Sequence, residues 1–185
     1  TSMATPLTAG AVALLRQFLR TKRGIATPSA ALVKALLIAG ATRLTKTAPP
    51  GTIADNHQGF GRVNLDGSTR RTLATIDGPR LNTGQRSTST ISVPSSGKKL
   101  RIVMCYTDFP GETLINNLNL IVTSPTGKRY TGNQPTSGGT LALDLNNNTE
   151  VVVVNKVTKG NWTLDVIASN VSSGPQDFAL AAVLL

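Results

Sequence analysis

The side chain with the clearest chemical potential is Ser2, whose hydroxyl stands directly before a segment with helical spacing. The first backbone N–H groups of a helix have no partner within the helix, and the positive end of the helix dipole lies there. A serine in this place can attack a carbonyl carbon, and its own N–H can help to bind the resulting oxyanion. The same place suits an ordinary N-cap, so the position alone leaves both interpretations open.

A nucleophilic serine needs a histidine base and a carboxylate that orients the base. The chain contains one histidine, His57, with Asp55 and Asp66 near it in the sequence. These residues could complete a triad, although a histidine in a polar loop is more often simply solvated. Cys105 is the only cysteine, so no internal disulfide can form. Its apolar neighbours indicate a buried structural thiol rather than a reactive one.

Three segments resemble the subtilisin-like serine proteases, or subtilases. Residues 1–6 (Thr-Ser-Met-Ala-Thr-Pro), with Ala-Gly at 9–10, resemble the serine motif of that family, which commonly has His-Val where this chain has Leu-Thr at 7–8. Residues 28–39 are similar to the helix that follows the serine helix. Residues 59–64 (Gly-Phe-Gly-Arg-Val-Asn) are similar to the closing element of subtilase domains.

This resemblance implies that Ser2 is the catalytic nucleophile and that its backbone N–H is an oxyanion donor. It also implies the chain order Asp, His, Ser, so both triad partners would precede Ser2 and His57 would not be catalytic. The Gly-x-Ser-x-Gly elbow of the α/β-hydrolases, whose histidine follows the serine, is absent. The 185-residue chain alone is therefore expected to be inactive.

Two helices must position the serine motif. Apolar side chains at helical spacing predict a helix over residues 4–20, ended by the basic turn 22–24 with Gly24 as a left-handed C-cap. A second helix is expected to begin with Thr27 as N-cap and Pro28 at the first helical position. It is apolar almost all round, which predicts burial in a core larger than this chain supplies.

The sequence changes character near residue 70, where helical spacing gives way to short β-type runs between turn residues. The runs predict nine strands, at 71–76, 87–93, 99–107, 117–124, 128–131, 140–144, 150–157, 161–169 and 176–185. We expect a mixed fold in two domains. Residues 1–70 would be the C-terminal remnant of a subtilisin-type α/β catalytic domain, and residues 71–185 an antiparallel β-sandwich that is jelly-roll-like.

Segments of the second part are similar to the jelly-roll domain of certain alkaline subtilases and to the P-domain of kexin- and furin-like convertases; in order they are 100–110, 114–120, 122–127 and 160–164. Some members of that family bind calcium in this domain. Asp108, Asn117 and Asn119 are the corresponding candidate ligands, but asparagine replaces the family's aspartate at 117 and 119. The loss of two charges should weaken a Ca²⁺ site. Asp108 could instead cap a turn.

Composition excludes few classes of protein but disfavours two kinds of partner. Hydrophobic residues make up 39% of the chain and charged residues 15%, which is ordinary for a soluble globular protein. The net charge is +10, but the basic residues are scattered and aromatics are only 4%, so no nucleic-acid partner is expected. No apolar run reaches the roughly 20 residues that cross a bilayer, so no membrane partner is expected.

The sequence thus predicts the C-terminal portion of a secreted serine endopeptidase that acts on protein or peptide substrates. Its partner would be the missing N-terminal part of the catalytic domain, and the sandwich would stabilise that domain. Two alternatives stay open, a non-catalytic module that binds substrate or carbohydrate and an inactive protease homologue. Exposed aromatics would favour the binding module.

Overall fold

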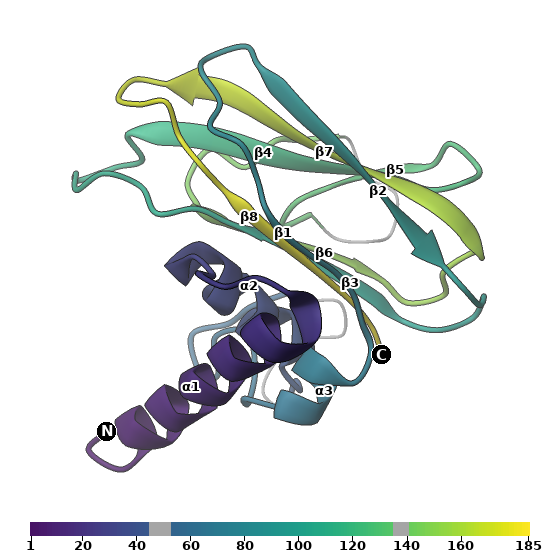
Figure 1. The fold of residues 1–185 in the computed structure, drawn as a ribbon. Coiled ribbons are helices and arrows are strands. Elements are labelled where there is room, and N and C mark those ends of the chain that lie inside the picture. The colour runs from purple at the N-terminus through teal and green to yellow at the C-terminus, as the bar shows by residue number, and fades with distance from the viewer. Residues whose placement is uncertain (45–52, 135–140) are drawn as a thin grey trace.

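The computed structural model of the chain describes residues 1–44, 53–134 and 141–185 (Figure 1). Within these residues three helices precede eight strands. The helices are α1 (Ala4–Arg23), α2 (Ala30–Gly40) and α3 (Leu65–Thr69). The strands are β1 (Thr72–Asp77), β2 (Arg86–Val93), β3 (Leu100–Cys105), β4 (Asn116–Thr123), β5 (Arg129–Thr131), β6 (Thr149–Val154), β7 (Gly160–Val171) and β8 (Ala179–Leu184).

The strands form two four-stranded antiparallel sheets, with orders β1-β8-β3-β6 and β2-β7-β4-β5. The sheets lie face to face and enclose one apolar core, which contains Trp162 and Tyr106 and alternate residues of β3, β4, β7 and β8. The predicted arrangement of N-terminal helices followed by an antiparallel β-sandwich is therefore confirmed. Most strand boundaries differ from the prediction by a few residues.

The strand predicted at 140–144 is wrong for residues 141–144, which are in no strand; residue 140 lies outside the described residues. The leucines at 141, 143 and 145 alternate with other residues, but all three side chains are exposed. Asp144 instead forms a turn, because its Oδ1 accepts the backbone N–H groups of Asn146 (2.8 Å) and Asn147 (3.1 Å).

The first helix runs three residues further than predicted, and Gly24 ends it as expected. Gly24 has φ 69° and donates its N–H to the carbonyl of Leu19. The left-handed conformation costs glycine little because it has no Cβ. Arg20, Lys22 and Arg23 lie in the last turn, where positive side chains interact favourably with the negative end of the helix dipole.

The predicted start of the second helix is wrong by two residues. Ser29, not Thr27, is the N-cap: it is extended (φ −64°, ψ 157°), and its Oγ accepts the N–H of Leu32 at 3.0 Å. Pro28 therefore precedes the cap instead of occupying the first helical position. The carboxylate of Asp77 at the end of β1 accepts hydrogen bonds from the N–H and the hydroxyl of Ser29, which fixes Ser29 in this role.

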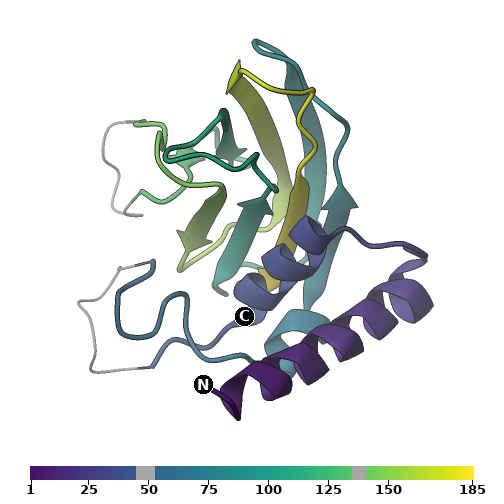
Figure 2. The same cartoon turned by 90° about the vertical axis from the view of Figure 1, so that its left-hand side faces the viewer.

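The expectation that α2 needs a larger core is also wrong, because this chain covers it (Figure 1 and Figure 2). The helix lies between α1 and the outer face of the sheet β1-β8-β3-β6. The cluster that buries it joins α1 and α2 to outward residues of three strands: Leu15, Leu19, Leu32, Leu36, Ala39, Val103, Cys105, Val151, Ala179, Ala181 and Val183. Strand β8 is consequently covered on both faces, which explains its uninterrupted apolar sequence.

The proposed boundary between two domains falls in the short link between α3, which ends at Thr69, and β1, which begins at Thr72. The division of the chain into 1–70 and 71–185 stays a prediction. The helices and the sheet nevertheless share one apolar cluster. The two parts are therefore held together by buried contacts.

Truncation of Leu36 tests this packing. Leu36 is fully buried in the cluster between α2 and the sheet, so Leu36→Ala should lower the free energy of unfolding by about 2–5 kcal/mol. Leu7→Ala is the matched control, since Leu7 is 74% exposed on α1 and its truncation should change stability by no more than about 0.5 kcal/mol. Urea unfolding followed by circular dichroism measures both. Equal values for the two variants would contradict the described packing.

Candidate functional site

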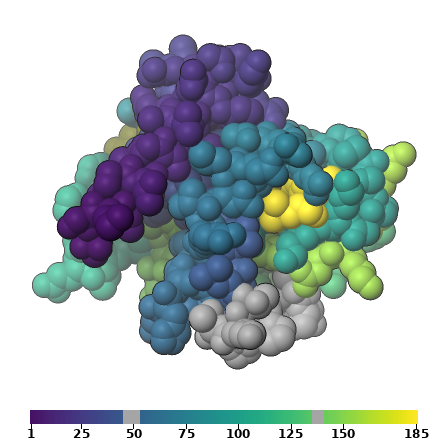
Figure 3. Space-filling model, turned by 90° about the horizontal axis from the view of Figure 1, so that it is seen from below, coloured from purple at the N-terminus to yellow at the C-terminus, as the bar shows by residue number. Residues whose placement is uncertain are grey.

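Ser2 lies on the surface at the start of α1, before the first helical residue. Met3 occupies the N-cap position with φ −92° and ψ −38°, and it makes no side-chain capping hydrogen bond. Ser2 is therefore not the capping residue of α1. Residues 1–10 are all exposed, and this end of α1 stands out at the side of the molecule (Figure 3, purple).

The backbone around Ser2 already has a helical hydrogen bond. The N–H of Thr5 donates to the carbonyl of Thr1 at 2.9 Å, which closes one turn around Ser2 before α1 begins at Ala4. The first turn of α1 contains no acidic side chain that would neutralise the positive end of the helix dipole. A developing oxyanion near Ser2 would therefore meet backbone N–H groups and a favourable dipole.

The residues near His57 do not form a catalytic pair with it. Asp55 Oδ1 accepts the backbone N–H groups of His57 (2.8 Å) and Gln58 (3.1 Å), and its Oδ2 lies 2.8 Å from Arg43 Nη2. Burial would raise the pKa of Asp55, but these hydrogen bonds and the Arg43 charge lower it below its usual value. The carboxylate thus holds the loop backbone and Arg43, and its bond to His57 is made with the peptide N–H.

Asp66, the other nearby carboxylate, forms an ion pair with Arg70 at 2.8 Å on the surface of α3. A triad carboxylate must accept a hydrogen bond from the imidazole ring. Since Asp55 and Asp66 both have other partners, the structure gives no support for a triad built from His57.

The three candidate calcium ligands have their oxygen atoms engaged in different ways. Asp108 Oδ1 accepts the N–H groups of Phe109 (2.9 Å) and Asn116 (3.0 Å), and its Oδ2 accepts that of Ile115 (2.8 Å). Asp108 therefore holds the turn before β4. Asn119 donates its amide to Asn117 Oδ1 (2.5 Å), which brings these two residues together.

Only Asn119 Oδ1 in this set is buried without a donor. The described residues contain no group of three or more His, Cys, Asp or Glu side chains that could hold a metal ion. Ca²⁺ usually takes six to eight oxygen ligands, several of them carboxylates. One orphaned amide oxygen does not provide such a set, so these residues fit Ca²⁺ poorly.

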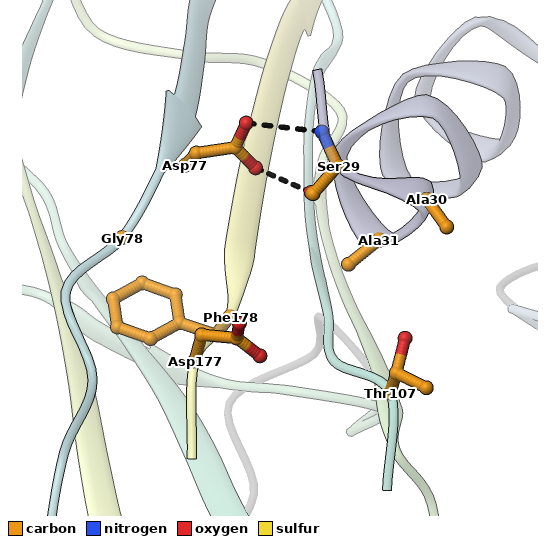
Figure 4. A pocket seen from close by; sticks show the side chains of 8 residues that line it. All are labelled: Ser29, Ala30, Ala31, Asp77, Gly78, Thr107, Asp177 and Phe178. Atoms are coloured by element: carbon orange, nitrogen blue, oxygen red, sulfur yellow. Dashed lines mark hydrogen bonds between the residues drawn. The ribbon is translucent and has the colours of Figure 1, made fainter. Parts of the chain in front are cut away.

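A small pocket lies where the start of α2 meets the ends of β1 and β8 (Figure 4). It encloses about 190 Å³ and is lined by Ser29, Ala30, Ala31, Asp77, Gly78, Thr107, Asp177 and Phe178. Ser29 is hydrogen-bonded to Asp77 across it. The pocket is smaller than the roughly 300–1,000 Å³ of typical ligand sites. Its polar groups serve the helix cap, which the sequence analysis did not foresee because the partner lies 48 residues away.

Glu150 is a second residue that sequence reasoning missed. It is 1% exposed, and its only described hydrogen bond is from the backbone N–H of Leu120. The signal was present in the sequence, since a single glutamate directly precedes four valines at 151–154 in an apolar strand. An acid in that setting is either paired or neutral.

Three comparisons with known proteins bear on the chain. Residues 1–61 match the subtilase family. No curated protein matches the chain.

None of the described helices is both long and apolar enough to cross a membrane.

Solved structures resemble the chain only distantly. A serine protease of Aeromonas sobria, in complex with its chaperone, is 16% identical over 98% of this chain and 43% of its own, with a TM-score of 0.35. This chain therefore spans less than half of that protease. The periplasmic inhibitor of g-type lysozyme from Aeromonas hydrophila is 14% identical over 62% of this chain and 87% of its own, with a TM-score of 0.39. A family 35 carbohydrate-binding module from Clostridium thermocellum is 13% identical over 60% of this chain and 92% of its own, with a TM-score of 0.32.

The reactivity of the Cys105 thiol tests whether the outer face of the sheet β1-β8-β3-β6 is buried. Burial raises the pKa of its thiol to about 11, although a weak hydrogen bond to Thr149 opposes the shift. The thiol should therefore stay neutral at pH 8 and react with iodoacetamide at least about tenfold more slowly in the folded chain than in urea. Mass spectrometry of timed samples measures the rates. Equal rates in the two states would show that the thiol is accessible.

Proposed function

Because residues 1–61 match the subtilase family, we propose that the chain is the C-terminal portion of a serine endopeptidase of that family, with Ser2 as its nucleophile. The single observation that carries the proposal is the state of Ser2. It sits exposed at the positive end of α1, inside the serine motif, and does not serve as the helix cap.

In the proposed reaction, Ser2 Oγ attacks the carbonyl carbon of a peptide bond, and a general base takes the hydroxyl proton. The tetrahedral oxyanion accepts a hydrogen bond from the Ser2 N–H, and its collapse breaks the C–N bond as the protonated base returns the proton to the leaving amine, which leaves an acyl-enzyme. Water then hydrolyses the ester. The base and its orienting carboxylate come from polypeptide that precedes Ser2, since the carboxylates near His57 are engaged elsewhere.

The surface of α1 supports a larger catalytic domain. Met3, Leu7 and Leu14 are 83%, 74% and 55% exposed, and their spacing places them along one side of the helix. Leu15 and Leu19 line a different side, which packs on α2. A helix with apolar residues on two sides is normally covered on both. The preceding part of the catalytic domain would cover the exposed side.

The sandwich is proposed to stabilise the catalytic domain rather than to bind substrate. Tyr106, Trp162 and Phe178 are buried in the core, so they cannot stack on a ligand. Phe109 is exposed and Tyr130 is half-buried against Trp162. These two side chains do not make an exposed cluster of aromatic rings on which a ligand could stack. The outer face of the sheet β1-β8-β3-β6 is instead covered by α2.

We propose that the parent enzyme acts outside the cell, because only 15% of the residues of this chain are charged and residues 1–61 match the subtilase family. Fractionation of a producing culture tests the location. Active enzyme should appear in the medium, and activity confined to the cells would contradict the proposal.

Labelling with a fluorophosphonate tests the nucleophile. The full-length parent should be labelled at Ser2, because only a serine activated by a base reacts quickly. Ser2→Ala should abolish labelling and reduce peptidase activity by at least about 10³-fold, while Ser172→Ala, at an exposed serine of the sandwich, should leave both unchanged. The 185-residue chain alone should not react. Labelling of the Ser2→Ala parent, or none of the wild type, would refute the assignment.

Calcium binding through Asp108, Asn117 and Asn119 is proposed to be weak at most. If Ca²⁺ at 1 mM does not exceed its dissociation constant, it stabilises the fold by no more than about 0.4 kcal/mol. The Tm of the 185-residue chain should then differ by less than about 2 °C between 1 mM CaCl₂ and EDTA. A shift of several degrees that Asp108→Asn removes would contradict this expectation.

A further inference from the structure

The chain crosses from one sheet to the other directly after β5, and backbone hydrogen bonds hold the crossing to both sheets. The N–H of Gly132 donates to the carbonyl of Leu120 in β4 at 3.0 Å. The next residue, Asn133, donates its N–H to the carbonyl of Val151 in β6 and accepts the Val151 N–H at its side-chain Oδ1, both at 3.0 Å. Asn133 has φ 58°, a left-handed conformation that asparagine tolerates better than most residues.

The side chain of Glu150 fills the space beside this crossing. Glu150 alternates with Val151 along β6, and Val151 belongs to the apolar cluster on the outer face of its sheet, so Glu150 points between the sheets. Its Oε2 accepts the backbone N–H of Leu120 at 2.7 Å. The ladder between β4 and β5 covers only residues 121–123 of β4, so it leaves this N–H without a partner in β5. A Cβ at Gly132 would lie 2.0 Å from this oxygen, so glycine is required there. Glu150 therefore joins β6 of one sheet to β4 of the other.

Among residues 1–44, 53–134 and 141–185, no ion pair balances this carboxyl group. The ion pairs of the described residues, Arg43–Asp55 and Arg70–Asp66, do not include Glu150. In the described part of the chain, the titratable groups that interact electrostatically with it are Asp144, from the segment before β6, and Tyr106, after β3. Burial would raise the pKa of Asp144, but hydrogen bonds from Asn133, Asn146 and Asn147 lower it, so this neighbour is negatively charged at neutral pH. The Tyr106 hydroxyl donates to the carbonyl of Asn116 at 2.8 Å.

The second oxygen of the Glu150 carboxyl group is an acceptor without a donor. Glu150 Oε1 is buried and has no hydrogen-bond partner among the described residues. A proton on Oε1 removes the buried charge, which is costly in an apolar core when nothing pairs with it. Burial raises the pKa of Glu150 to about 8; the Leu120 N–H opposes this shift and the charge of Asp144 adds to it.

We propose that the neutral carboxyl group of Glu150 is a proton-dependent link between the two sheets, and that its ionisation weakens the contact between β4 and β6. The next residue, Val151, packs in the apolar cluster that also contains residues of α1 and α2, so this contact lies close to the helices. The inference rests on the sandwich alone and does not depend on the proposed peptidase activity.

The direction of the pH effect follows from proton binding. The folded chain keeps the Glu150 proton up to a pH of about 8, whereas an unfolded glutamate releases it near its ordinary pKa of 4.5. Between these values the folded state binds more protons than the unfolded state, so stability falls as the pH rises. The contribution is complete below about pH 4.5 and lost above about pH 8.

Urea unfolding of the 185-residue chain at pH 5, 6, 7, 8 and 9 tests the proposal with two variants. Glu150→Gln keeps the shape and the acceptor for Leu120 but cannot ionise. Glu112→Gln, at the other glutamate of the chain, is the matched control because Glu112 is exposed. Relative to Glu150→Gln, the folding equilibrium constant of the wild type should fall by up to about tenfold per pH unit between pH 5 and 8. Glu112→Gln should follow the wild type.

Two results would overturn the proposal. The first is parallel pH profiles for the wild type and Glu150→Gln. The second is a Ca²⁺-dependent rise in stability at pH 8 in the wild type but not in Glu150→Gln, which would show that a cation and not a proton neutralises the site. If Glu150→Gln does not fold, an NMR titration of the wild-type carboxyl carbon decides the question. A midpoint near 8 supports the link, and a midpoint near 4.5 refutes it.

Discussion

The structure depends on the burial of α2 between α1 and one sheet of the sandwich. This helix is apolar on almost every side, so it is stable only where other elements cover it. The alanines of β8 at 179 and 181 make room on the sheet, and Leu15 and Leu19 close the opposite side. The chain therefore buries α2 with its own residues, although its sequence suggested that only a larger domain could do so.

The same contact determines how the candidate nucleophile is presented. The buried side chains of α1 are Ala11, Leu15 and Leu19, while the first ten residues of the chain have no buried side chain. Ser2 thus lies at the exposed end of a helix whose later turns are packed against the rest of the chain. The exposed apolar side of that helix and the exposed serine lie on the same end of α1, and under the proposed function both would be covered by one partner surface.

Sequence patterns predicted helix and strand ends correctly where the residue at the end determines the backbone conformation by itself. Gly24 could be identified as a C-cap because a left-handed conformation is a property of the residue itself. The choice of Ser29 over Thr27 as N-cap depends on Asp77, which is distant in sequence and could not be read from local spacing. The leucines at 141, 143 and 145 had the period of a strand, but the turn at Asp144 prevents pairing. For the site, the serine motif was readable from its residues, whereas the state of Glu150 depends on how two sheets meet.

The central claim is that Ser2 becomes acylated during turnover in the intact enzyme. Acid quenching of the full-length protein during hydrolysis of a peptide ester, followed by digestion and mass spectrometry, measures this directly. The account predicts the acyl group on the peptide that contains Ser2. Steady turnover with no acylated peptide, or an acyl group on another residue, would contradict it.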